Sequence, residues 1–179
     1  IISVYDNYVR AFRWASDRIG DNDGIIAFIT PNGWMTGSVF EGFRKCIQTE
    51  FSKAYVFDLR GDGAGTYKKE GDNVFVYGSN RGCKTGVAIT LLVKKVNSKV
   101  PFEVHYCDIM TLNEGYHVLE KRATVAKNIS FMDMKNRGAL QLILPKPNGD
   151  WLVERSEVFG TLIPLAGDTH KKFAKHDED

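Results

Sequence analysis

Apolar side chains in the first half of the chain recur at helical spacing in two segments. Within residues 6–19 and within residues 39–51, an apolar side chain returns every three or four positions, which stacks these side chains on one helical face. Asp6 is placed to cap the first helix, and Ser38 and Glu41 have the spacing of a capping box before the second. We therefore predict two amphipathic helices with their apolar faces in the core. Those faces carry Tyr8, Phe12, Ala15, Ile19, Phe40, Phe43, Ile47 and Phe51, and Trp14 and Trp151 are expected to be packing residues as well.

Short continuous apolar runs alternate with these helices. Residues 25–29, 54–59 and 87–93 are runs of the kind found in strands that are covered on both faces, as in parallel sheets. A helix joins the first run to the second, which predicts parallel strands with a right-handed crossover. No helical pattern separates the second run from the third, which favours an antiparallel third strand. The predicted fold is α/β, with an open, mostly parallel sheet and one reversed strand. Alternation over residues 102–107 predicts a further, half-exposed strand.

Composition excludes several classes of protein. The chain has 179 residues, of which 43% are hydrophobic and 26% charged, so it is globular rather than disordered or fibrous. No apolar stretch approaches the roughly 18 residues of a membrane helix. The amino end has no signal-peptide pattern and begins abruptly in apolar residues, which suggests a piece of a longer protein. The three cysteines form no CxxC pair and the four histidines no metal-binding spacing. We therefore expect no metal site, and a cytoplasmic location.

Basic side chains gather in the Gly-rich connection after the second apolar run. The whole chain has a net charge of +2, but residues 60–99 carry eight basic and three acidic side chains, a local net charge of +5. Such an excess is typical of a polyanion footprint, and equally of a solvated loop. Ligands of open α/β sheets lie outside the carboxyl ends of the strands, where residues 31–34 and this connection leave the sheet. Paired carboxylates, a nucleophile elbow and a phosphate-binding loop are all absent, so the residues alone identify no reaction.

Six segments of the chain agree in order and spacing with one protein family. They are Tyr8–Ile19, Gly24–Thr30, Arg44–Lys45 with Tyr55–Gly61, Asn73–Phe75, Thr85–Lys95 and Gly149–Leu152. Together they resemble the methyltransferase region of Type ISP restriction-modification enzymes, large single chains with nuclease, helicase, adenine-N6 DNA methyltransferase and target-recognition parts. More distantly, they are similar to the modification subunits of Type I systems. The resemblance covers residues 5–165 and is strongest over residues 8–95.

The resemblance implies part of a Rossmann-like, S-adenosylmethionine-dependent methyltransferase sheet. The three apolar runs would be its fifth, sixth and seventh strands, with the last one antiparallel between the other two. Residues 1–100 would be the C-terminal half of the catalytic domain, residues 101–165 an extension leading into the target-recognition region, and residues 166–179 a flexible tail. Implied partners are duplex DNA and the upstream half, helicase and nuclease parts of the same parent chain. No membrane partner is expected, and an exposed sheet edge would invite self-association.

Two motifs of adenine methyltransferases are missing from the sequence. These are the Asn/Asp-Pro-Pro-aromatic motif and the Gly-rich motif that binds S-adenosylmethionine; in the family both lie upstream of the helix at residues 6–19. No catalytic residue is therefore assigned, and the isolated chain is expected neither to bind this cofactor well nor to methylate. Phe75 matches the aromatic residue that stacks on the flipped-out adenine. The resemblance further implies DNA-phosphate contacts from Arg60, Lys68, Lys69, Arg81 and Lys84, and a pocket rim formed by Pro31, Asn32, Gly33 and Trp34.

Three functions from different classes fit the sequence. The favoured interpretation is a fragment of a site-specific DNA adenine-N6 methyltransferase within a restriction-modification enzyme. A DNA-binding or target-recognition module without chemistry is the second, and a structural α/β subdomain is the third. An Asn/Asp-Pro-Pro-aromatic motif upstream in the parent reading frame would support the first, and salt-dependent binding of this chain alone to duplex DNA would favour the second.

Overall fold

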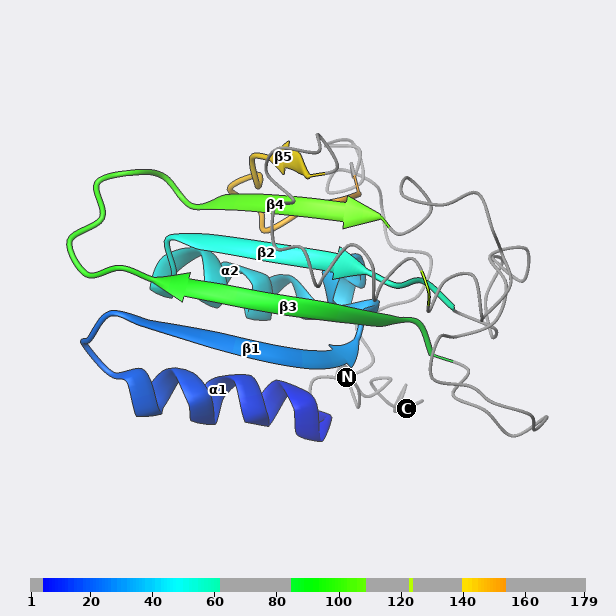
Figure 1. Ribbon diagram of the computed structural model, residues 1–179, viewed down its shortest axis with the longest axis horizontal. Coiled ribbons are helices and arrows are strands. Elements are labelled where there is room, and N and C mark those ends of the chain that lie inside the picture. Colours follow the sequence, from blue (N-terminus) through cyan, green and yellow to red (C-terminus); the bar gives the residue numbers. More distant parts are fainter. Residues whose placement is uncertain (1–4, 62–84, 109–122, 124–139, 154–179) are drawn as a thin grey trace, which may run out of the picture.

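The computed structural model describes residues 5–61, 85–108, 123 and 140–153 (Figure 1). Along the chain its elements are α1 (Asn7–Ile19), β1 (Gly24–Pro31), the 3-10 turns Gly33–Met35 and Ser38–Phe40, α2 (Glu41–Glu50), β2 (Lys53–Asp58), β3 (Val87–Lys94), β4 (Glu103–Asp108) and β5 (Gln141–Ile143). The five strands form one sheet in the order β1-β3-β2-β4-β5. None of the helices within these ranges is long and apolar enough to cross a membrane. The tail predicted at residues 166–179 lies outside the described residues.

The reversed strand lies where the sequence placed it. β3 runs antiparallel to both of its neighbours, with Leu92 opposite Ile26 of β1 and Ala54 of β2. The chain passes from β1 to β2 through α2, whereas no helix is described between β2 and β3. The predicted α/β fold and the reversed third strand between two parallel ones are therefore confirmed. The expectation of a mostly parallel sheet with one reversed strand is wrong, because β5 is also antiparallel to its neighbour and the sheet is mixed.

The sheet continues beyond the three apolar runs. β4 pairs in parallel with β2, from Lys53 opposite Glu103 to Asp58 opposite Asp108, and β5 pairs antiparallel with β4. The predicted strand at 102–107 is thus observed one residue later, with alternating burial along most of its length. Because β4, which follows residue 100, pairs with β2, which precedes it, the described strands of the predicted extension belong to the same sheet as the first hundred residues. The boundary at residue 100 stays a prediction.

Both helices cover the same face of the sheet and build one aromatic core. α1 and α2 meet through Phe12 and Phe43, whose ring centroids are 5.5 Å apart. Trp34, from the turn after β1, is 0% exposed and contacts both of these rings. The strand side chains that point to this core are Ile26, Ala54, Val56, Ala88, Leu92, Val104 and Tyr106. The predicted core role of the two apolar helix faces is confirmed, and Trp151 is buried against Trp34 as expected.

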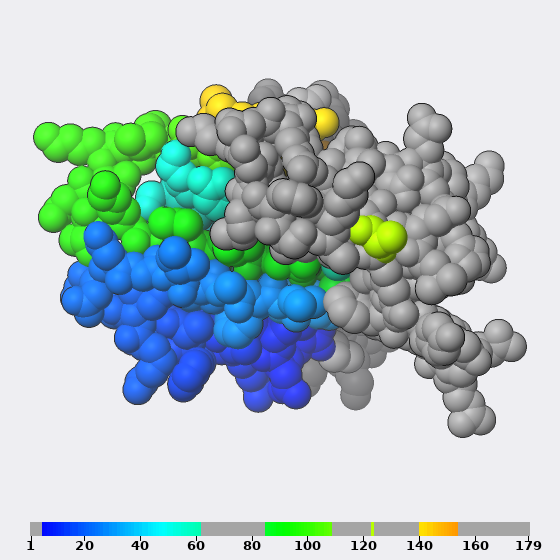
Figure 2. Space-filling view, in the orientation of Figure 1, coloured from blue at the N-terminus to red at the C-terminus, as the bar shows by residue number. Residues whose placement is uncertain are grey.

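The opposite face of the sheet is only partly covered. Figure 2 looks onto this face, where side chains of β1 (blue) and β3 (green) reach the surface. Ile25 is 66% and Ile29 59% exposed, although the apolar run predicts burial on both faces. The difference has a simple cause: both described helices lie on the other side of the sheet (Figure 1).

Three local predictions at the helices are wrong. α2 begins at Glu41, two residues later than expected, because Ser38–Phe40 forms a 3-10 turn, and no side chain caps its first residues. Glu41 instead accepts a hydrogen bond from Lys45 Nζ at 2.7 Å. Asp6 flanks α1 without a side-chain cap bond. Trp14 is 64% exposed, with the Arg18 guanidinium 6.0 Å from its ring centroid. It lies two residues from Phe12, about 200° around the helix, and so faces away from the core.

We expect the 179-residue chain to self-associate through β1. Within the described sheet β1 pairs on one side only, and none of its eight residues is charged, so its other edge offers free backbone donors and acceptors. Sedimentation velocity at rising protein concentration should show dimers or larger species. Ile29→Lys should shift the distribution toward monomer, because a charge beside an open edge disfavours pairing. Leu144→Lys, at an equally exposed position outside β1, is the control; a wild-type chain that stays monomeric throughout would contradict this expectation.

Candidate functional site

The carboxyl ends of β1, β2 and β4 meet at one edge of the sheet, together with the start of β3. There the backbone N–H of Asn32 donates to the carbonyl of Gly86 at 2.9 Å, and the N–H of Val87 donates to the carbonyl of Arg60 at 3.1 Å. The connection that spans residues 62–84 therefore leaves the sheet and returns to it at this same edge. Ligands of open α/β sheets bind at such an edge.

Asp58 joins three strands at this edge. Its buried carboxylate accepts hydrogen bonds from Asn32 Nδ2 and from the Arg60 backbone N–H, each at 2.9 Å, on Oδ1. Oδ2 accepts a third, also at 2.9 Å, from the hydroxyl of Tyr106 on β4. Three donors compensate the burial of a charge that would otherwise be costly. Burial, and next the charge of Asp58, raise the pKa of Tyr106 well above its ordinary value, so its phenol remains a donor at neutral pH.

Arg60, one of the predicted phosphate contacts, is held by carboxylates. Its Nε donates to Oδ2 of Asp108 at 3.1 Å, its Nη2 contacts the same oxygen, and Nε lies 3.6 Å from Oδ2 of Asp58. The hydrogen bonds to Asp108 are the main cause that raises the pKa of Arg60 above its ordinary value. A DNA phosphate would have to compete with these carboxylates, so a phosphate contact by Arg60 stays a prediction that this pairing disfavours.

The predicted rim residues divide into two groups. Pro31, the last residue of β1, and Asn32 are half-buried, and Gly33 is exposed; all three lie at this edge. The side chain of Trp34 instead packs in the core between the helices, because the 3-10 turn Gly33–Met35 directs it away from the edge. The rim role of the first three residues stays a prediction. Phe75, Lys68, Lys69, Arg81 and Lys84 lie outside the described residues.

Gly86 allows Asn32 to reach Asp58. A Cβ atom at position 86 would lie 2.5 Å from Nδ2 and 2.8 Å from Cγ of Asn32. Gly86→Ala should therefore push the Asn32 amide away from the buried carboxylate and lower the free energy of unfolding by about 1–3 kcal/mol. Urea unfolding of the chain measures this change. Gly33→Ala is the control, because a Cβ there meets no atom within 4 Å; equal midpoints for the two variants would mean that Asn32 moves without cost.

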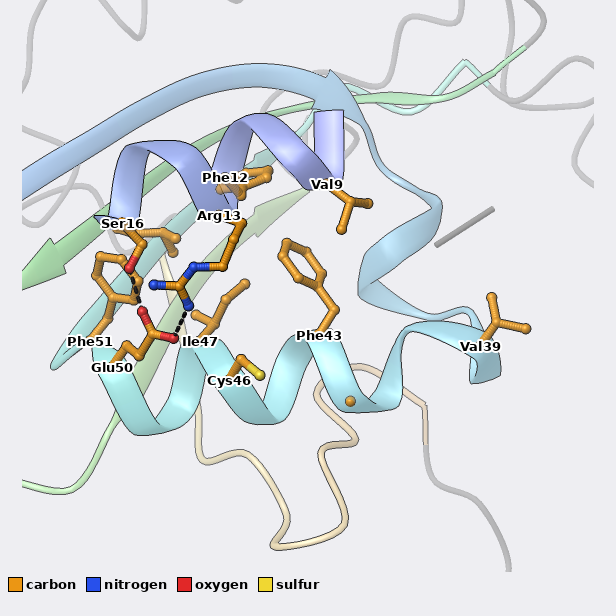
Figure 3. A pocket seen from close by; sticks show the side chains of 12 residues that line it. Val9, Phe12, Arg13, Ser16, Val39, Phe43, Cys46, Ile47, Glu50 and Phe51 are labelled. Carbon is orange, nitrogen blue, oxygen red and sulfur yellow. Dashed lines mark hydrogen bonds and ion pairs between the residues drawn. The ribbon is translucent and has the colours of Figure 1, made fainter. Parts of the chain in front are cut away.

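A groove lies between α1 and α2, away from the strand ends. Its volume is about 390 Å³, and Figure 3 shows Phe12, Phe43, Ile47 and Phe51 along its apolar wall. Glu50 closes one end, where it accepts hydrogen bonds from Arg13 and Ser16. Asp58 and the residues that contact its carboxylate, Asn32, Arg60 and Tyr106, do not line this groove. Within the part of the chain that the structure describes, three or more His, Cys, Asp or Glu side chains nowhere gather as a metal site.

Sequence reasoning missed two buried charged residues, Arg44 and Asp150, which form an ion pair at 3.5 Å. A signal for Arg44 was present: it lies four residues after Phe40 and three before Ile47, and so falls on the apolar stripe of its helix. A charged residue at such a position is almost never buried without a partner. The partner lies 106 positions further along the chain, beyond the range of any local pattern.

Comparisons with known proteins place this fold. No family model matches the chain, and no curated protein matches it. Among solved structures, the ATP-dependent Type ISP restriction-modification enzyme LlaBIII bound to DNA matches with 35% identity over 93% of this chain and a TM-score of 0.75. A nuclease-deletion mutant of the Type ISP enzyme LlaGI, in complex with a DNA substrate mimic, matches with 30% identity over 95% of this chain (TM-score 0.73). A DrdV–DNA complex matches with 29% identity over 86% of this chain (TM-score 0.68).

The chain spans only a small part of these neighbours, 11% of LlaBIII, 15% of LlaGI and 14% of DrdV. Identity of this level over nearly the whole chain, together with the shared fold, agrees with the family that the sequence motifs indicated. The chain is therefore the counterpart of one region of the Type ISP restriction-modification enzymes.

Proposed function

We propose that this chain is the C-terminal half of an adenine-N6 DNA methyltransferase domain in a restriction-modification enzyme, followed by the start of its target-recognition region. The observation that carries the proposal is the reversal of β3 between β1 and β2. That strand order is the one the methyltransferase resemblance implies. The match to LlaBIII bound to DNA supports the same assignment.

The edge at the strand ends is the proposed contact with DNA. The connection of residues 62–84, anchored there at both ends, carries Phe75 and the four basic residues Lys68, Lys69, Arg81 and Lys84. Phe75 would stack on an adenine turned out of the duplex, which offsets part of the stacking energy lost on flipping. The basic residues would bind phosphates and fix the position of the duplex without reading its sequence. Pro31, Asn32 and Gly33 would form the rim of the pocket.

The described residues do not form a site for S-adenosylmethionine. The Asp58 carboxylate at the strand ends already accepts three hydrogen bonds from its own chain, and the groove between α1 and α2 is lined mainly by apolar side chains. We therefore assign the methyl donor to other parts of the longer protein and derive no step through it. On this proposal the isolated chain does not methylate, and its partners are duplex DNA and the remaining parts of the parent chain, including its helicase and nuclease parts.

A methyl-transfer assay tests the proposal. The full-length protein, with labelled S-adenosylmethionine and duplex DNA, should place the methyl group on N6 of adenine, as nuclease digestion and mass spectrometry of the nucleosides would show. The 179-residue chain alone should transfer none. Transfer to cytosine would refute the adenine-N6 assignment, and no transfer at all by the full-length protein would refute the methyltransferase assignment.

A DNA-binding module without chemistry is the second candidate, favoured by the local charge of +5 over residues 60–99. If the four loop cations other than Arg60 each neutralise one phosphate, log K for duplex DNA should fall with log salt at a slope of roughly −3 to −4. Fluorescence anisotropy of labelled duplex with the 179-residue chain measures this slope. Binding by the chain without methylation by the full-length protein would favour the module, and no binding at low salt would favour a structural subdomain.

A further inference from the structure

Arg44 is a cation buried in the core beneath the strand ends. Its side chain, 1% exposed, projects from the middle of α2. Nε donates to the carbonyl oxygen of Gly149 at 2.6 Å, and Nη1 donates to those of Trp34 and Gly37 at 2.7 and 2.8 Å. Nη2 lies 3.5 Å from Oδ1 of Asp150, whose side chain is equally inaccessible. One side chain therefore holds two backbone segments that are distant from each other in the sequence.

Stability alone does not account for an arginine at this position. Burying an ion pair is costly, and apolar residues of similar volume often give an equally stable core. An arginine adds direction, because its planar fork of donors fixes where its acceptors lie. Three of the acceptors of Arg44 are backbone carbonyls. Arg44 therefore fixes the position of the backbone rather than that of a side chain.

The first segment held by Arg44 is the turn after β1. Within it the N–H of Met35 donates to the carbonyl of Asn32 at 3.0 Å, and the N–H of Gly37 donates to that of Gly33 at 2.9 Å. Asn32 in turn reaches Asp58 at the strand ends. Arg44 is thus connected through one short turn to the proposed pocket rim.

The second segment is the turn at residues 146–150, which places the Asp150 carboxylate beside the Arg44 guanidinium. The N–H of Lys146 donates to the carbonyl of Asp150 at 3.0 Å, and Asn148 Nδ2 donates to its Oδ2, also at 3.0 Å. Gly149 has a φ of +83°, and a Cβ there would lie 3.0 Å from the carbonyl oxygen of Glu41, so the turn lies directly against α2. The next residue, Trp151, packs on Trp34 with ring centroids 5.3 Å apart.

We propose that Arg44 is a positioning residue for the methyl-transfer pocket: paired with Asp150, it sets the turn that carries Asn32 and Gly33. The inference rests on the proposed function above. On this inference residues 146–151 help to position the pocket rim through Arg44, although they lie more than a hundred positions after the rim in the sequence. Arg44 itself touches no reacting group.

Amide hydrogen exchange in the 179-residue chain tests the positioning directly. Arg44→Lys keeps a positive charge near Asp150 but lacks the planar fork. The amides of Met35 and Gly37 should then exchange at least tenfold faster than in the wild type, while those of β3 keep their protection. Arg13→Lys is the matched control, because Arg13 is an exposed guanidinium that pairs with Asp17 and Glu50. Unchanged exchange of Met35 and Gly37 in Arg44→Lys would overturn the inference.

Steady-state kinetics of the full-length protein give the functional readout. Arg44→Lys should lower kcat for methylation at least tenfold per folded molecule, with the KM for S-adenosylmethionine within twofold of wild type. A purely structural role would lower the amount of folded protein and leave kcat per folded molecule unchanged, which would overturn the inference. Asp150→Asn should reproduce the loss, and Arg13→Lys should not. If the wild-type protein transfers no methyl group, the proposed function fails, and the exchange result still decides whether Arg44 sets the turn.

Discussion

Replacing Trp34 with alanine is expected to lower the free energy of unfolding by about 3–5 kcal/mol, the range for removing a fully buried tryptophan. The indole is fully buried and lies 6.0 Å from Phe12, 5.6 Å from Phe43 and 5.3 Å from Trp151, measured between ring centroids. The substitution removes all three ring contacts and leaves a cavity among Phe12, Phe43 and Trp151. Urea unfolding, followed by far-ultraviolet circular dichroism, measures the loss.

Trp14→Ala is the matched control, because it removes the same side chain from an exposed position on α1. Because 64% of Trp14 is exposed and its ring contacts the Arg18 guanidinium, the expected change in the free energy of unfolding is below about 1 kcal/mol. Equal destabilisation by the two variants would contradict a core centred on Trp34. The Trp14→Ala variant also checks the orientation of α1, since a helix rotated by half a turn would bury Trp14 and make its removal costly.

Replacing Phe75 with alanine in the full-length protein is expected to slow adenine methylation roughly 5- to 150-fold. That range corresponds to the 1–3 kcal/mol that stacking of one base on an aromatic side chain contributes. The unfolding midpoint should stay at its wild-type value, because the prediction assigns Phe75 to the DNA and not to the core. Single-turnover methylation of a duplex with one target site measures the rate.

Aromatic replacements at the same position provide the control for Phe75. Phe75→Trp and Phe75→Tyr keep a stacking surface and should retain most of the activity. With 2-aminopurine in place of the target adenine, the fluorescence of the complex reports whether the base leaves the duplex. Full activity of Phe75→Ala would rule out the stacking role, whichever effect the aromatic variants have.

The directions of the three apolar strands were predictable from the types of connection between them, whereas the place of the third strand between the other two was implied by the family resemblance. A helix between residues 25–29 and 54–59 requires a parallel crossover, and its absence before residues 87–93 permits a reversed strand. The ends of these strands agree within two residues with β1, β2 and β3. These apolar runs are also five to seven residues long, which is typical of strands and short for helices.

The polar contacts at the site were not predictable in the same way. Asp58 meets Tyr106 across 48 positions, and Arg44 meets Gly149 across 105, so that neither pair has a local pattern. The capping box failed for a related reason: Ser38 and Glu41 have the right spacing, but the turn held by Arg44 through Gly37 continues into Ser38–Phe40 as a 3-10 helix. Tertiary contacts that are invisible in the local sequence decided both outcomes.

The hydrogen bond between Val87 and Arg60 closes the base of the connection of residues 62–84. Because the chain leaves and re-enters the sheet at adjacent backbone positions, the length of this connection is independent of the strand register. Doubling a flexible loop costs only about 0.6 kcal/mol of closure entropy. Residues can therefore be inserted into or removed from this connection without a change in the register of β2 and β3.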